Sequence, residues 1–259
     1  MSSIELLYKF ARKSNLEMVE AIQPNDLKHA YELQKINSEY LSSIGGWKLG
    51  GTTELTRRLF NTQNTYYGVL DSNVIFNASE EIKLPEKINH CVGEVEVCFR
   101  LSKKAASINQ YNLEKSDVNI FIDAVMPSIE LPWSNFQLPD EGLNVLIADS
   151  CAAGALIVGN PIPWNDQSEE LLRDKVRLNC GDMVLAEGEI ENIIDGPVQA
   201  LKEFLLLAKE HQLELKQGHL VATGGCTPCV PLPLNDTLTV SFELLGSFSF
   251  KMKGNGDEG

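Results

Sequence analysis

Three acidic residues stand among apolar residues in segments typical of β-strands. Glu94 and Glu96 lie one residue apart in the run 92–99, which reads VGEVEVCF, and Glu130 follows in the run 126–132, which reads MPSIELP. Residues i and i+2 of a strand point to the same face. Glu94 and Glu96 are therefore predicted to share one face of a strand and to sit against an apolar layer.

Acidic side chains in such a position have two interpretations. Buried like charges repel, and each is costly to remove from water unless something neutralises it. A divalent cation would do so, because Mg²⁺ or Mn²⁺ prefers oxygen ligands and keeps positions open for water and substrate. The alternative is an edge strand whose outer face is in water. The Glu94-x-Glu96 pair alone leaves both open.

Lys48 is the second charged residue in an apolar setting. It lies between Trp47 and Leu49 in the run 46–52, GWKLGGT, whose glycines let a backbone approach a neighbour closely. The lysine either extends its ammonium to water at a sheet edge or points into a pocket.

One cysteine spacing is chemically suggestive. The chain has six cysteines, of which four lie in apolar or strand-like surroundings typical of reduced core residues. Cys226 and Cys229 form a single C-x-x-C motif, CTPC. It could be a redox pair or half of a zinc site, although no second such motif or spaced histidine pair accompanies it. Otherwise it is a proline-bent loop that carries two thiols.

Composition limits the classes of function. The 259 residues carry a formal charge of −14 and no cluster of lysine or arginine, so nucleic acid is not an expected partner. No apolar run reaches the length of a membrane span, and the N-terminus does not resemble a signal peptide. We expect one catalytic domain in a cytoplasmic protein.

Helices are predicted mainly near the N-terminus. Residues 4–11 form a short amphipathic stripe, and Asn25 is expected to cap a longer helix that ends before the glycines at 45–46. A further helix is predicted from Asn112 to about Ala124, which would place Glu130 at the start of the next extended segment. Another is predicted from 195–197 to about His211.

Strands are predicted through the middle and end of the chain. Short ones are expected at 69–70 and 74–76, a hairpin between 176 and 187, a strand at 220–225, and a closing pair at 238–244 and 247–252. The pattern favours an α+β fold with a curled mixed β-sheet. Its predicted organisation is an N-terminal helical segment (1–45), a catalytic domain (46–253) and a disordered tail (254–259).

Taken in order, these motifs resemble a known family across nearly the whole chain. The run 46–52 is similar to the family pattern G-x-K-[IL]-G-x-T, and Glu94-x-Glu96 and the run 127–130 follow, with Ala148-Asp149 and Thr223-Gly224 later. The family is that of the 2-keto-4-pentenoate hydratases and 4-oxalocrotonate decarboxylases, within the fumarylacetoacetate hydrolase C-terminal-domain superfamily.

The resemblance implies roles for particular residues. Glu94, Glu96 and Glu130 match positions that hold Mg²⁺ or Mn²⁺, and Lys48 matches an active-site lysine. Substrate contacts are implied for two residues, Leu49 and Thr227. The partners implied are a small 2-keto acid and further copies of the same chain.

One position departs from the family pattern. The family's hydratases carry an acidic residue just before an aromatic-glycine pair, about eighteen positions after the lysine, where this chain has Tyr66. A phenol, with an ordinary pKa near 10, is a poor substitute for a carboxylate. Three outcomes stay open: Tyr66 donates a proton in a modified mechanism, another group such as Asp71 serves in its place, or the standard activity is lost.

The resemblance implies a metal-dependent lyase that hydrates a small unsaturated 2-keto acid such as 2-hydroxypenta-2,4-dienoate. Three alternatives stay open: a decarboxylase of the 4-oxalocrotonate type, an acylpyruvate hydrolase, and a catalytically impaired scaffold subunit. The hydrolase typically needs a His-Glu pair that activates water, and His90 precedes the acidic strand without a clear glutamate partner.

Overall fold

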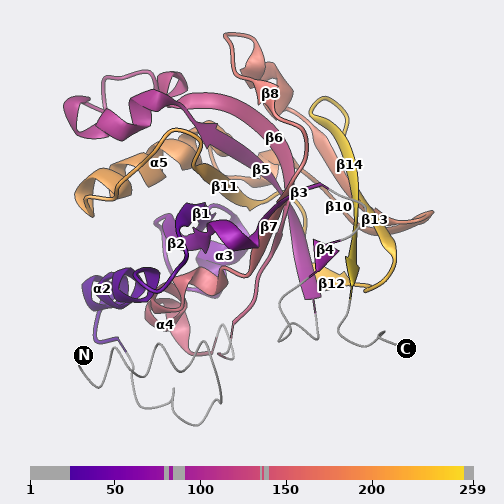
Figure 1. Ribbon diagram of the computed structural model, residues 1–259, viewed down its shortest axis with the longest axis horizontal. Helices are drawn as coiled ribbons and strands as arrows, with labels where there is room; N and C mark the ends of the chain where they lie inside the picture. Colours follow the sequence, from indigo (N-terminus) through magenta and orange to yellow (C-terminus); the bar gives the residue numbers. More distant parts are fainter. Residues whose placement is uncertain (1–23, 79–81, 84–90, 135, 137–139, 254–259) are drawn as a thin grey trace.

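The computed structural model describes residues 24–78, 82–83, 91–134, 136 and 140–253. These residues form two β-sheets with a few helices around them (Figure 1). The α+β fold with a curled mixed sheet, predicted from the sequence, is confirmed. The stripe at 4–11 and the tail at 254–259 lie outside the described residues.

The larger sheet carries most of the sequence motifs. Its strands follow the order β2-β1-β11-β5-β6-β7-β3, with β12 added to β5 and β8 added to β6. Pairing is antiparallel except between β1 and β11 and between β3 and β7, which run parallel. The strands are β1 (Ile44–Gly50), β2 (Tyr66–Asp71), β3 (Ile75–Asn77), β5 (Cys91–Leu101), β6 (Ile122–Leu131), β7 (Ala155–Val158), β8 (Ile162–Pro163), β11 (Leu220–Gly225) and β12 (Val230–Leu232).

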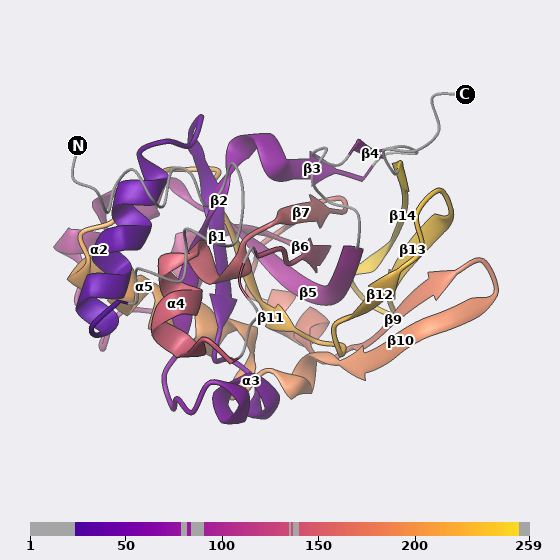
Figure 2. The same ribbon diagram turned by 90° about the horizontal axis from the view of Figure 1, so that it is seen from below.

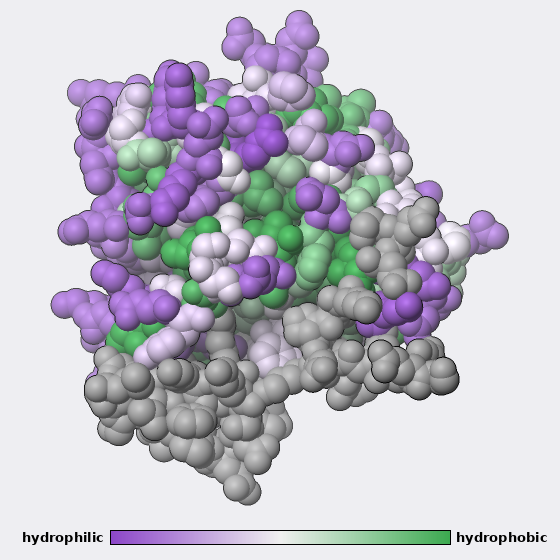
Figure 3. Space-filling model, viewed as in Figure 1, coloured by the Kyte–Doolittle hydropathy of each residue, from purple (hydrophilic) through white to green (hydrophobic). Residues whose placement is uncertain are grey.

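A second sheet lies on the side of the molecule opposite α2 and α4 (Figure 2). It follows the order β10-β9-β13-β14-β4. Hydrophobic side chains gather near the centre of the face that Figure 3 shows, and hydrophilic ones line much of its margin. The strands are β4 (Ile82–Lys83), β9 (Lys175–Cys180), β10 (Met183–Glu189), β13 (Thr237–Phe242) and β14 (Gly246–Lys253). The hairpin and the closing strand pair predicted from the sequence are therefore confirmed.

Helices cover one end and one face of the larger sheet (Figures 1 and 2). The last of them, α5, buries its apolar stripe of Leu201, Phe204, Leu205 and Ala208. None of the described helices is long and apolar enough to cross a membrane. The α-helices are α2 (Leu27–Ser38), α3 (Glu54–Leu59), α4 (Gly142–Ala148) and α5 (Gly196–Glu210), and the 3₁₀ turns are η2 (Ser72–Val74), η3 (Lys103–Gln110), η4 (Val118–Phe121), η5 (Ser150–Ala152), η6 (Ser168–Leu172) and η7 (Ile190–Asn192).

Two details of the helix predictions are wrong. Asp26, not Asn25, caps α2, because its carboxylate accepts a hydrogen bond from the amide of His29 at 2.8 Å. The helix expected from Asn112 to Ala124 is only the short turn η4, after which the chain enters β6. Pairing with β5 and β7 stabilises the extended form there, so Glu130 lies near the end of a strand.

Gln34 joins α2 to the rest of the fold. Its side-chain amide is 2% exposed and donates to the carbonyls of Tyr67 in β2 and Ile147 in α4, at 2.9 and 2.8 Å. A buried carbonyl that loses a donor costs free energy, because no water replaces it.

Gln34→Leu should therefore lower the free energy of unfolding by about 1–3 kcal/mol. The neighbouring Lys35 is exposed, so Lys35→Ala should change it by less than about 0.5 kcal/mol. Urea unfolding followed by circular dichroism measures both. Equal stability of the two variants would show that the Gln34 bridge does not hold α2 in place.

Candidate functional site

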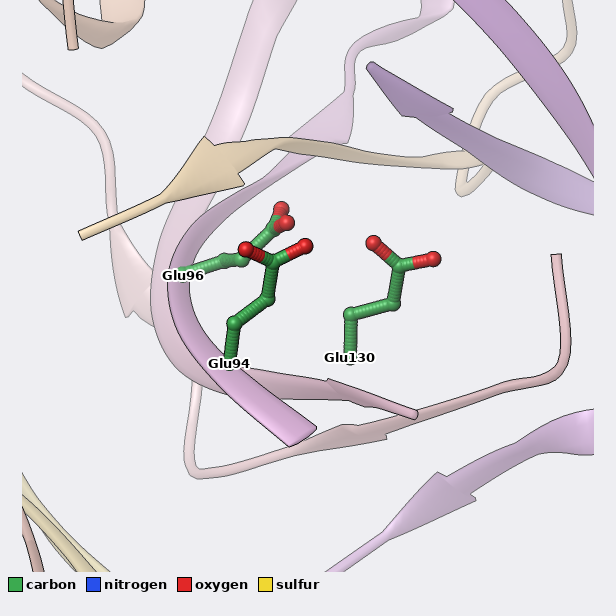
Figure 4. A group of neighbouring side chains, drawn as sticks. All are labelled: Glu94, Glu96 and Glu130. Atoms are coloured by element: carbon green, nitrogen blue, oxygen red, sulfur yellow. The ribbon is translucent and has the colours of Figure 1, made fainter. Parts of the chain in front are cut away.

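The register of β5 and β6 brings the three acidic residues together. Glu94 lies directly opposite Glu130, and Glu96 lies opposite Ser128. Since residues two apart on a strand share a face, all three side chains project to the same side of the sheet. One oxygen from each carboxylate lies within 4.8 Å of the others. Figure 4 shows the three carboxyl groups turned toward a common space.

These carboxylates are not on a wet edge. Glu96 and Glu130 are 0% exposed, because β5 is an inner strand with β11 on one side and β6 on the other. Glu94 is half-buried. Glu96 Oε1 and Glu130 Oε1 have no hydrogen-bond partner in the structure, and Glu130 Oε2 has only its ion pair with Lys48. Buried carboxylate oxygens without hydrogen-bond partners indicate a site arranged to receive a ligand.

The cluster opposes its own ionisation. Burial, followed by the charge of Glu130, raises the pKa of Glu94 to about 7, against the opposing effect of Lys48. Burial also raises the pKa of Glu96 and of Glu130. A positive charge between the carboxylates would remove this repulsion, and their hard oxygens suit a divalent cation.

Lys48 points into the same space. It lies on β1, between Ala222 of β11 and Gly68 of β2, and is 7% exposed. Its Nζ lies 3.1 Å from Glu130 Oε2, so the ammonium forms an ion pair with that carboxylate. Burial alone lowers the pKa of Lys48, but Glu130 and Glu94 outweigh it, so the pKa is raised. The pocket interpretation of Lys48 is therefore correct.

The backbone of β11 fixes one carboxylate. The amide of Gly224 donates to Glu96 Oε2 at 2.8 Å. Gly224 has a φ of +109°, and a Cβ there would overlap the hydroxyl of Thr52, so only glycine suits the position. The sequence motif marked Thr223-Gly224 without revealing this hydrogen bond.

Tyr66 lies on β2, the strand that pairs with the one carrying Lys48. It begins β2 opposite Gly50 and is 4% exposed. Its ring lies so close to Gly50 and Gly51 that a Cβ on either would meet it. Burial and the nearby Cys151 raise the pKa of the phenol, while Lys48 lowers it. Tyr66 therefore keeps its proton and is held by tight packing.

The implied substrate contacts have mixed positions. Leu49 follows Lys48, so its side chain points to the opposite face and lies in the hydrophobic core, 2% exposed. Thr227 lies near the cluster, where its hydroxyl accepts a hydrogen bond from the amide of Val95 at 3.0 Å. The side chain of Leu49 therefore faces away from Lys48, and only its backbone adjoins that residue.

Asp71 is not a substitute for the missing acid. It lies at the far end of β2, opposite Ile44, whereas Lys48 lies opposite Gly68. Its carboxylate accepts hydrogen bonds from the amides of Ser42 and Asn73, which is a structural role. His90 lies outside the described residues.

The C-x-x-C motif is neither a disulfide nor a described metal cluster. All six cysteines are free, with Cys226 buried and Cys229 exposed. Four cysteines are buried, which is the number predicted from the sequence. Cys226 of the C-x-x-C motif is one of the four, whereas Cys180 is only half-buried. Within the described residues, the metal-ligand cluster is that of the three glutamates.

A separate cavity of about 1000 Å³ lies between α2 and α5. Tyr66 lines it, but none of the three glutamates does. Glu32, Glu203 and Glu210 line the cavity, but they are not part of the cluster of acidic residues described above, so the cavity is separate from it.

Two curated relatives are similar in sequence to most of the chain, although no family model matches. A 4-oxalocrotonate decarboxylase from Pseudomonas putida is 22% identical over 226 residues, which is 85% of this chain and 81% of the relative. A 2-keto-4-pentenoate hydratase from Paraburkholderia phymatum is 22% identical over 254 residues, 92% and 90% of the two chains.

Solved structures share the fold. The 4-oxalocrotonate decarboxylase from Pseudomonas putida G7, complexed with magnesium and adipate, has a TM-score of 0.79 at 20% identity and covers 96% of this chain and 97% of its own. The fumarylpyruvate hydrolase from Pseudomonas aeruginosa, in complex with Mn²⁺ and pyruvate, has a TM-score of 0.59 at 13% identity over 81% and 89%. The resemblance of this chain to the 2-keto-4-pentenoate hydratase and 4-oxalocrotonate decarboxylase family, with the fumarylacetoacetate-hydrolase-like fold, is confirmed.

Proposed function

We propose that the protein is a metal-dependent lyase that hydrates a small unsaturated 2-keto acid of the 2-hydroxypenta-2,4-dienoate class. The observation that carries the proposal is the buried triad of Glu94, Glu96 and Glu130, with unpartnered oxygens beside the ammonium of Lys48. Relatives with such activities, and neighbours of the same fold solved with magnesium, calcium or manganese, support it.

The donor set fits a hard divalent cation. Three carboxylates carry three negative charges and Lys48 carries one positive charge, so a dication would bring the cluster to neutrality. Glu94, Glu96 and Glu130 would hold Mg²⁺ or Mn²⁺. When bound, the cation would supply Lewis-acid chemistry, since a 2-keto carboxylate can chelate it through two oxygens and so lose electron density from its conjugated chain.

Lys48 and Tyr66 supply the protons and positive charge of the site. The Lys48 ammonium, held by Glu130, would stabilise negative charge on the C2 oxygen of the substrate. The phenol of Tyr66 keeps its proton, so it would act as a donor toward carbon rather than as a base. Ketonisation of the dienol makes the distal alkene electrophilic, and water can then add to it.

Decarboxylation is the second candidate, because both a decarboxylase and a hydratase are relatives at 22% identity. Loss of CO₂ from a suitable keto acid would leave the same kind of enolate, and Tyr66 could protonate it. An assay of metal-loaded protein on 2-hydroxypenta-2,4-dienoate and 2-oxohex-3-enedioate separates hydration from decarboxylation. Hydration removes the conjugated absorbance without release of CO₂, whereas decarboxylation releases CO₂.

Thermal unfolding with Mg²⁺ and oxalate tests whether the site works. Oxalate mimics the chelating keto acid, so both together should raise the melting temperature more than either alone. At about 100 times Kd, binding adds about 2.7 kcal/mol, which corresponds to a rise of roughly 5–10 °C. Absence of a joint shift would favour the scaffold alternative.

Glu96→Gln should weaken Mg²⁺ binding by at least about 100-fold, because it removes a charged ligand, and should abolish turnover. Isothermal titration calorimetry gives the affinity. Glu114 is an exposed acid, so Glu114→Gln is the matched control and should bind Mg²⁺ normally. Turnover by Glu96→Gln without added metal would count strongly against the proposal.

Tyr66→Phe should lower kcat by about 10²-fold, because it removes a proton donor while keeping the ring packed on Gly50. The joint shift with Mg²⁺ and oxalate should persist in this variant. A variant with normal kcat would exclude Tyr66 as the donor.

A further inference from the structure

Three consecutive residues just before β7 have a strained backbone. Ser150, Cys151 and Ala152 of η5 have φ angles of +53°, +55° and +57°, and all three are buried. Residues with a Cβ atom seldom enter this left-handed region, and then normally one at a time, because the Cβ approaches the following carbonyl oxygen. Such strain persists only where the surrounding structure holds it, and it gathers at functional sites.

The turn covers the outer edge of β2. Among the described strands, β2 pairs with β1 alone and ends the strand order. The thiol of Cys151 donates to the Tyr67 carbonyl at 3.0 Å. A Cβ atom on Gly68 would lie 1.9 Å from the Ser150 carbonyl oxygen, so the two backbones are in direct contact. Gly68 is the residue that pairs with Lys48, and the turn therefore packs beside the position of the lysine.

The other end of the turn is held by the segment that carries Glu130. The Ala152 carbonyl accepts a hydrogen bond from the amide of Trp133 at 2.8 Å. A Cβ atom on Gly154 would lie 2.2 Å from the carbonyl oxygen of Leu131, the last residue of β6. Because Glu130 directly precedes Leu131, the turn bridges the edge of β2 to the end of β6 that bears this acid.

The bridge connects the same two parts of the curled sheet as the ion pair of the proposed site. In the strand order, β1, β11 and β5 separate β2 from β6. Lys48 on β1 meets Glu130 on β6 at 3.1 Å. Tyr66, which begins β2, packs in one buried cluster with Cys151 and Ala152. The turn thus adjoins the supports of both side chains that would handle protons.

The side chains of the turn add stiffness to this bridge. Its contacts with Gly68 and Trp133 use the carbonyls of Ser150 and Ala152, which glycine would offer equally well. Glycine reaches the left-handed region freely, whereas a Cβ atom narrows the dihedral angles open to a residue. The chain therefore carries the strain in exchange for a turn with little freedom to move.

We propose that the left-handed turn Ser150–Ala152 is a positioning element, which holds β2 against the end of β6 and so fixes Lys48 and Tyr66 relative to Glu130. This inference rests on the proposed function, because it concerns the geometry of that reaction. The turn acts through the two strands and not on the substrate. Loosening it should lower the rate of the bound complex, since small displacements of catalytic groups are costly to the rate.

The test relaxes the turn and keeps its backbone contacts. Ser150→Gly and Ala152→Gly should each lower kcat by about 10-fold on the substrate that the wild type consumes, with KM and Mg²⁺ affinity within about 2-fold of wild type. Their melting temperatures should not fall, because glycine carries no left-handed penalty. The conservative variant Ser150→Ala keeps the Cβ atom and should retain the wild-type kcat.

Gln212→Gly is the matched control. Gln212 also has a left-handed φ, of +54°, but it is exposed and follows α5. This variant should keep the wild-type kcat, and its melting temperature should not fall.

Three results would overturn this inference and leave the proposed function standing. The first is an unchanged kcat in Ser150→Gly and Ala152→Gly. The second is an equal loss of kcat in Ser150→Ala, because the hydroxyl would then account for the effect. The third is a loss of kcat that comes with a lower melting temperature and a matching rise in KM, which is the result of a purely structural role.

The proposed function fails by a different result. A wild type without the joint Mg²⁺–oxalate shift, or one that consumes neither 2-hydroxypenta-2,4-dienoate nor 2-oxohex-3-enedioate, contradicts it. The positioning role would then fall as well, because it has no reaction to serve.

Discussion

Repulsion among three buried carboxylates is the constraint on which the site depends. Glu94, Glu96 and Glu130 converge within 4.8 Å, and two of them are fully buried. One ammonium cannot balance three such charges, and burial raises the pKa of each acid. A fold that keeps this arrangement must gain something from it. Binding of a dication explains both the charge and the unpartnered oxygens.

The strands around the cluster each supply one part of it. β5 and β6 set the spacing of the acids by register, β11 holds Glu96 through the amide of Gly224, and β1 brings Lys48 to Glu130. Gly50 at the end of β1 and Gly51 after it leave room for the ring of Tyr66. The curled sheet is therefore the device that brings together residues far apart in sequence.

Part of this arrangement was predictable from the sequence. Strand periodicity correctly placed Glu94 and Glu96 on one face, because that relation is local. The order of the motifs indicated the fold and the convergence of Glu130 and Lys48 through resemblance. The β-hairpin and α5 followed from turn residues and helical periodicity.

The errors lie where pairing between distant segments decides. Asn112–Ala124 has the cap and spacing of a helix, yet pairing with β5 and β8 holds its end extended as the start of β6. Asp71 is near Tyr66 in sequence but at the far end of β2, and only the register with β1 separates it from Lys48. The hydrogen bond from Gly224 to Glu96 likewise depends on the register between β11 and β5.

A crystal grown with Mn²⁺ and measured at a wavelength that gives anomalous signal tests the central claim most directly. The account predicts an anomalous peak with one oxygen from each of Glu94, Glu96 and Glu130 at about 2.0–2.3 Å, typical of a hard dication. No peak there at saturating Mn²⁺, with Lys48 still closed onto Glu130, would contradict it.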